Sequence, residues 1–167
     1  MARISKARTT RASTATTATE RRLALVLFLI ALGLSLSSGA LASDATLGTT
    51  IDRWSRTIGA DARSVSLAAK QRHPRLMTMG ALRFRKDALR AHAAIGAQRA
   101  SRVAGLRAKS LALRAFSNYA MAGKRWAASG RARLTHRKAR AWALARSANT
   151  FAKRGNRLLV AAGKLVT

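Results

Sequence analysis

Hydrophobic and polar positions follow two different patterns along this chain. Residues 23–42 form one uncharged run, which is most strongly apolar as far as Leu36. Farther along, apolar side chains recur every three or four positions, as at Ile51, Trp54 and Ile58, which is typical of an amphipathic helix. The patterns predict an all-α protein with an N-terminal signal or transmembrane helix, followed by a loose bundle of Ala/Arg-rich helices.

The first helix of the bundle is predicted to follow a short polar stretch. Residues 43–50 predict a linker, and Thr49 or Thr50 has a side chain suited to an N-cap. Pro74 predicts that this helix ends near residues 71–73, because the residue before a proline disfavours helical geometry. Four segments result: a basic Ser/Thr/Ala-rich region (1–22), the hydrophobic segment (23–42), the linker (43–50) and a basic helical region (51–167).

Leucines spaced seven residues apart predict a packed helical hairpin after residue 75. Leu82, Leu89, Gly96 and Val103 would form one stripe along a helix, like a short heptad seam. The stripe is too short to predict a coiled coil.

Small residues predict where the later helices end. Gly123, Ser129 and Gly130 predict breaks, and Gly155 predicts the end of a helix over residues 131–153. That last helix would carry a basic face and an apolar face. The basic face comprises Arg133, Arg137 and Arg140, and the apolar face comprises Ala141, Leu144, Ala145, Ala148 and Ala152.

Charge changes the interpretation of the bundle. The chain holds 33 lysines and arginines against five acidic residues, which gives a formal net charge of +28. From residue 88 to the end there are 18 basic residues and no acidic side chain. Such an excess favours binding to anions and opposes compaction. It leaves open whether the basic region folds fully only on a partner or membrane.

The apolar run predicts passage through, or retention in, a membrane. Arg21 and Arg22 precede it, and small residues at Ala40 and Ala42 match a signal-peptidase pattern with cleavage before Ser43. Twenty apolar residues can also span a bilayer as an uncleaved anchor. Either alternative predicts an exported or membrane-anchored protein with its C-terminal region translocated.

An organellar address is the alternative location. The first nineteen residues are rich in Ser, Thr, Ala and Arg and lack acids, which is typical of a transit peptide. An organellar membrane or lumen is therefore the second predicted compartment.

Catalytic and metal-binding chemistry is not predicted. The chain has no cysteine, and its few acids are scattered through the first half. His73, His92 and His136 are far apart and lie among cations, which repel metals. We therefore expect a protein that is not an enzyme and carries no cofactor.

The basic stretch predicts an anion-binding surface. Guanidinium groups suit bidentate contact with phosphate. The predicted footprint comprises Arg99, Arg102, Arg107, Lys109, Arg114, Lys124, Arg125, Arg131, Arg133, Arg137, Lys138 and Arg140. Tyr119, Trp126 and Trp142 lie among these cations and could stack on bases or sit at a lipid interface, although packing in the core is favoured for each of them.

Two functions follow from these features. The first is a non-enzymatic protein that binds anionic surfaces, namely lipid headgroups, an envelope polymer or nucleic acid, through Arg-rich helices. The alternative is a structural or assembly subunit of a membrane or organellar complex, held by residues 23–42 and contacting an acidic protein partner.

Overall fold

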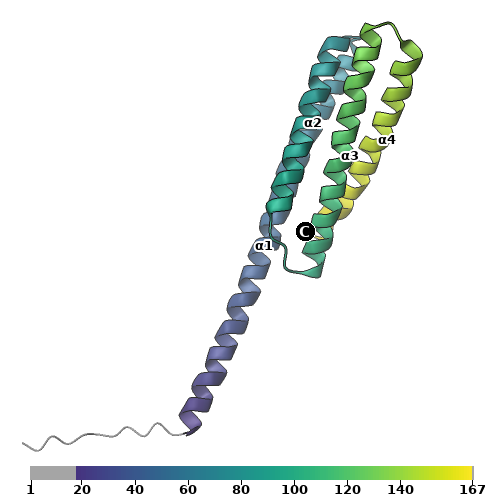
Figure 1. Cartoon of the computed structure of the whole chain (residues 1–167). Coiled ribbons are helices and arrows are strands. Elements are labelled where there is room, and N and C mark those ends of the chain that lie inside the picture. The colour runs from purple at the N-terminus through teal and green to yellow at the C-terminus, as the bar shows by residue number, and fades with distance from the viewer. Residues whose placement is uncertain (1–17, 167) are drawn as a thin grey trace, which may run out of the picture. The chain divides into compact units, whose positions relative to one another are not determined.

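The structure is a computed structural model that describes the backbone of residues 18–166 and the side chains of residues 43–166. All its regular elements are helices, and no strand occurs among these residues, which confirms the all-α prediction. The chain from Gly39 onward forms a compact unit, in which α2, α3 and α4 lie side by side (Figure 1). The helices are α1 (Ala18–Lys70), α2 (Pro74–Ala97), α3 (Val103–Leu134) and α4 (Lys138–Gly163).

The targeting predictions concern a different part of the chain. The segments 1–22 and 23–42, with the cleavage site after Ala42, lie outside the residues whose side chains are described. Within residues 43–166, no helix is both long and apolar enough to cross a membrane.

Residues 43–50 are helical, where the sequence predicted a linker. The hydroxyls of Thr49 and Thr50 do not cap a helix start; both donate to the carbonyl oxygen of Thr46, at 3.0 and 2.8 Å. Leu47 is fully buried in the core. This packing favours helix beyond the local preference of the polar residues around Leu47, and α1 continues through the stretch.

The end of α1 lies where Pro74 predicted it. Arg72 adopts a left-handed conformation (φ 56°), and the N–H of His73 donates to the carbonyl oxygen of Ala68 at 3.0 Å. This is a Schellman-type cap, which satisfies the last carbonyl groups of a helix. Pro74 then opens α2, where its fixed φ suits the first helical turn.

A heptad seam exists on α2, but it is one position away from the predicted stripe. Leu82 and Leu89 are about half exposed, and the buried positions fall at alternating spacings of four and three residues. The predicted stripe was wrong because it assumed that the larger side chains face the core. The small side chains of Ala81 and Ala88 let α3 approach closely, and the two leucines remain partly exposed to solvent. The buried apolar residues of α2 are Met77, Ala81, Phe84, Ala88, Ala91 and Ile95.

The predicted breaks in α3 are helix–helix contacts instead. A Cβ on Gly123 would lie 2.8 Å from Cβ of Arg85 and 2.9 Å from the carbonyl oxygen of Ala81. Gly130, one heptad later, lies against Thr78 in the same way, and Ser129 is fully buried. Close packing against α2 therefore compensates for the low helix propensity of glycine, and α3 continues to Leu134.

Close packing also explains why α4 continues beyond Gly155, where the sequence predicted its end. A Cβ on Gly155 would lie 2.9 Å from Cε1 of Tyr119 and 3.1 Å from the carbonyl oxygen of Ala115 on α3. Gly155 belongs to a row of small buried residues spaced seven apart, a spacing that keeps one face of a helix toward its neighbour. The row is Ala141, Ala148, Gly155 and Ala162.

Aromatic side chains fill the centre of the bundle. The ring of Phe84 lies edge-on to those of Tyr119 and Trp126, with centroids 5.9 and 5.3 Å apart, and Phe116 packs on the other side of Tyr119. The hydroxyl of Tyr119 donates to Oδ1 of Asn156 at 3.3 Å. Burial raises the pKa of Tyr119 to about 12, because the apolar surroundings disfavour the phenolate.

Titration of the single tyrosine should therefore report folding. We expect the folded chain to ionise Tyr119 at a pKa of about 12 rather than 10.0. Because the raised pKa favours the neutral form, its stabilising contribution is complete below the unfolded pKa and is lost as the pH rises toward 12. Ultraviolet absorbance of the tyrosinate measures this directly. A midpoint that is unchanged by urea unfolding would contradict the buried position.

Candidate anion-binding site

A hollow on the bundle surface, between α3 and the start of α4, is surrounded by cations. Its volume is about 550 Å³. Small and apolar side chains form part of its wall, among them Met121, Ala128 and Leu144. The cationic side chains that line it are Lys124, Arg125, Arg131, Arg137 and Arg140, all of which belong to the predicted footprint.

Helical spacing explains why these cations converge. On α3, Lys124 and Arg131 are seven residues apart, which places both on the edge that faces α4. Arg137 is the N-cap residue of α4, and Arg140, three residues later, lies in the first turn of that helix. A three-residue connection turns the chain back, so the two basic edges meet across the hollow.

The connection itself is fixed by hydrogen bonds. The N–H of Arg137 donates to the carbonyl oxygen of Ala132 at 2.9 Å, and His136 takes the left-handed conformation (φ 57°) of a helix cap. The buried hydroxyl of Ser129 donates to the carbonyl oxygen of Ala141 at 2.8 Å. These contacts hold the first turn of α4 against α3 beside the hollow. The cations are thus mounted on rigid elements.

No carboxylate in the described part of the chain neutralises this end of the bundle. The sequence contains no Asp or Glu after residue 87. Asp44 accepts a hydrogen bond from the N–H of Ser101 at 3.2 Å, and Asp52 pairs with Arg56 on its own helix. The ion pairs of residues 43–166 lie on α1 and α2 and include none of the five cations of the hollow.

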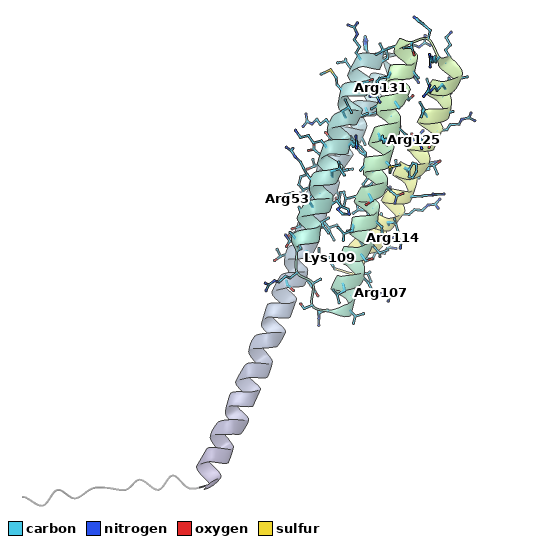
Figure 2. The ribbon with its side chains drawn as sticks, in the orientation of Figure 1. Arg53, Arg107, Lys109, Arg114, Arg125 and Arg131 are labelled. Carbon is cyan, nitrogen blue, oxygen red and sulfur yellow. The ribbon has the colours of Figure 1, made fainter. Side chains whose placement is uncertain are left out.

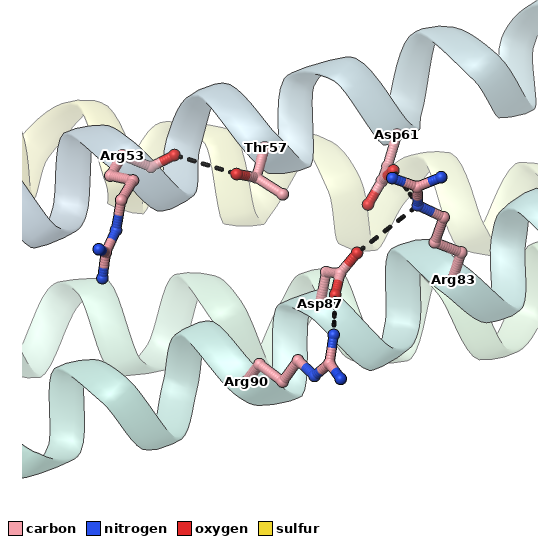
Figure 3. A network of polar contacts seen from close by, with 6 residues as sticks. All are labelled: Arg53, Thr57, Asp61, Arg83, Asp87 and Arg90. Atoms are coloured by element: carbon pink, nitrogen blue, oxygen red, sulfur yellow. Dashed lines mark hydrogen bonds and ion pairs between the residues drawn. The ribbon is translucent and has the colours of Figure 1, made fainter.

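The other two acids of residues 43–166, Asp61 and Asp87, form a buried pair between α1 and α2 (Figure 3). Nε of Arg83 lies 3.2 Å from Asp61 and 3.8 Å from Asp87, and Arg90 lies 3.2 Å from Asp87. Burial, with the nearby Asp87 carboxyl, raises the pKa of Asp61, and the charge of Arg83 opposes that shift. The sequence did not predict the contact between Asp61 and Asp87, because these residues are 26 positions apart. The pair connects α1 to α2 through Arg83, and neither acid lines the hollow.

The predicted footprint is divided along α3. Figure 2 shows Arg107, Lys109 and Arg114 toward the N-terminal end of α3, and Arg125 and Arg131 toward its C-terminal end. The 24 residues from Arg107 to Arg131 span about 36 Å at a rise of about 1.5 Å per residue. One compact ligand cannot contact both groups.

Several footprint residues have other surroundings. Nζ of Lys109 donates to the carbonyl oxygen of Gln98 at 2.6 Å, which satisfies the end of α2. Arg99 and Arg102 lie in the connection between α2 and α3. Arg133 and Lys138 are next in sequence to residues that line the hollow, but they do not line it themselves.

Two of the three aromatic residues in the predicted site belong to the core. Tyr119 is 5% exposed, and Nε1 of Trp126 donates to Oδ1 of Asn149 at 3.1 Å while its ring packs on Phe84. Trp142, on α4, is 64% exposed. Of these three residues, Trp142 is therefore the one whose ring is exposed at the surface for stacking.

No group of three His, Cys, Asp or Glu side chains within residues 43–166 is arranged to hold a metal ion. No protein-family model matches this chain, and no curated protein or solved structure matches it either. Its function must be inferred from its own residues and their geometry.

Proposed function

We propose that this chain is an exported or membrane-anchored, non-enzymatic protein that binds phosphate-bearing polyanions. Lipid headgroups, an envelope polymer and nucleic acid all present such groups. The contact surface is the hollow between α3 and α4, defined by Lys124, Arg125, Arg131, Arg137 and Arg140.

One observation carries the proposal: five cations converge on one hollow, and none of them forms an ion pair with a carboxylate of residues 43–166. Like charges held together on rigid helices repel one another, so the bare surface is unfavourable and an anion relieves the repulsion. Four of the five are arginines, whose planar guanidinium groups bind phosphate oxygens in pairs. Trp142 is exposed on the same helix as Arg140 and offers a face on which a base or headgroup can pack.

The location is proposed from the sequence. The uncharged run at 23–42, with Arg21 and Arg22 before it, favours export or anchorage, with an organellar membrane or lumen as the alternative. In either location, the chain would bind its polyanion outside the compartment in which the chain is synthesised.

Salt dependence tests the proposed binding. If all five cations contact phosphates of a short DNA duplex, the logarithm of affinity falls against the logarithm of salt with a slope of about −4.5. Affinity should then drop about 500-fold between about 50 and 200 mM salt. Fluorescence anisotropy of a labelled duplex, with anionic vesicles in parallel, measures the slope and identifies the preferred source of phosphate. Equal affinity at both salt concentrations would overturn electrostatic binding.

A second function, a subunit of a membrane or organellar complex, is favoured by exposed apolar side chains on α2. Met79, Leu82 and Leu89 are 67, 45 and 50% exposed. Exposed apolar side chains along one helix favour a protein interface. Co-purification of stoichiometric partners with a membrane-extracted chain supports this function. A soluble monomer that begins at Ser43 counts against it.

A further inference from the structure

A second and larger recess lies between α1 and α4, within the compact unit that begins at Gly39. Its volume is about 960 Å³, in the range of small-molecule sites in proteins. The recess is mainly apolar, and its floor is formed by Ile58, Phe84, Tyr119, Trp126 and Leu159. It shares no lining residue with the basic hollow.

Gly59 keeps this recess open on the α1 side. A Cβ on Gly59 would meet only the far end of Arg63, at 3.7 Å, in contrast to the crowded Gly123 and Gly155. Among the described residues, no other helix comes within 4 Å of that Cβ to explain the absence of a side chain. The space beside it is therefore available to a ligand.

Donor groups stand at the α4 rim of the recess. Lys153 and Asn156 both line it and are three residues apart, which puts them on one face of the helix. Oδ1 of Asn156 accepts the hydroxyl of Tyr119, so its Nδ2 is left to donate elsewhere. Asp52, the acid across the recess, pairs with Arg56. The rim therefore presents a cation and an amide donor above an apolar floor.

We propose that this recess binds a single-chain anionic amphiphile, a long-chain carboxylate. The hydrocarbon tail lies on the aromatic and aliphatic floor, and the head group accepts hydrogen bonds from Lys153 and Asn156. The charge of Lys153 favours an anionic head, and the apolar floor favours a hydrocarbon tail over a compact ion. This site is separate from the hollow proposed for polyanions.

Calorimetric titration with dodecanoate tests the proposal, with dodecanol as the uncharged probe. Filling the recess by Gly59→Phe should lower dodecanoate affinity at least tenfold. The matched control is Gly96→Phe, because Gly96 lies outside the recess and a Cβ there would meet nothing closer than 4.0 Å. Equal affinity in both variants would overturn the proposed site. Circular dichroism verifies that both variants fold.

The head-group contact has its own test. Lys153→Gln should weaken dodecanoate several-fold and leave dodecanol unchanged, whereas Lys164→Gln should affect neither. A variant with Lys124, Arg125, Arg131 and Arg140 changed to glutamine should retain dodecanoate binding. Loss of binding in that variant would show that dodecanoate is held by the basic hollow, and would overturn the proposal for the recess while supporting the one for polyanions.

Discussion

Replacing Lys124, Arg125, Arg131 and Arg140 by glutamine is expected to weaken binding to a short DNA duplex by on the order of 10³-fold near 0.1 M salt. Each cation that contacts a phosphate releases a counterion, so four lost contacts remove most of the electrostatic free energy of binding. The slope of affinity against salt should fall from about −4.5 to about −0.9. Anisotropy titrations at several salt concentrations measure both quantities.

The control for this variant must remove the same charge from elsewhere. Arg63, Arg75, Lys86 and Arg157 are exposed, lie outside the hollow and form no ion pair among residues 43–166. Changing them to glutamine gives the same net charge and the same ratio of arginine to lysine. We expect less than a tenfold loss of affinity. Equal losses in the two variants would mean that total charge, and not the hollow, determines binding.

Substitution of Gly123 by leucine is expected to destabilise the fold by about 3 kcal/mol, the upper range for overpacking a core. The added Cβ would lie 2.9 Å from the carbonyl oxygen of Ala81, an atom of the α2 backbone that cannot move by a simple rotation. The helices α2 and α3 must therefore separate, which also loosens the contacts of Phe84. Urea denaturation followed by circular dichroism measures the change.

Gly96 again provides the matched position. It is an exposed helical glycine, and a Cβ there would touch only Leu113, at 4.0 Å. Gly96→Leu should raise stability by up to about 1 kcal/mol, because leucine favours helix over glycine. If both leucine variants changed stability alike, close contact at Gly123 would not be what fixes the distance between the helices.

Helix formation in this chain could be predicted from sequence, because it depends on local properties. The spacing of Ile51, Trp54 and Ile58 identified the first bundle helix, and the position of Pro74 identified its end. The predictions for residues 43–50 and for Gly123 and Gly155 were wrong for a shared reason. In each case a contact with another helix outweighs a local preference, and no local pattern reveals that contact.

The side of α2 that faces the core could not be inferred from the size of its side chains. The sequence contains two parallel rows, one through Leu82 and Leu89 and one through Ala81 and Ala88. The row through Ala81 and Ala88 is buried, because the glycine and alanine residues of α3 bring that helix close to α2, where only small side chains fit. Only the pairing of the two helices decides between the rows.

The sequence identified the cations of the site as anion-binding candidates, but it did not show which of them lie close together in space. Composition showed that the second half of the chain lacks acids. It could not show that Arg137 and Arg140 meet Lys124 and Arg131 across one hollow, nor that Lys109 satisfies the end of α2. The recess beside Gly59 and Lys153 left no local pattern, since its residues come from four helices.

Protection of individual lysines on polyanion binding would locate the bound DNA on the surface of the bundle. The chain is treated with an amine-acylating reagent with and without the DNA duplex, and mass spectrometry gives the reactivity of each lysine. We expect strong protection of Lys124, which lines the hollow, and unchanged reactivity of Lys70 and Lys86 on α1 and α2. Equal protection of all three lysines, or protection of Lys70 and Lys86 alone, would contradict binding at the hollow.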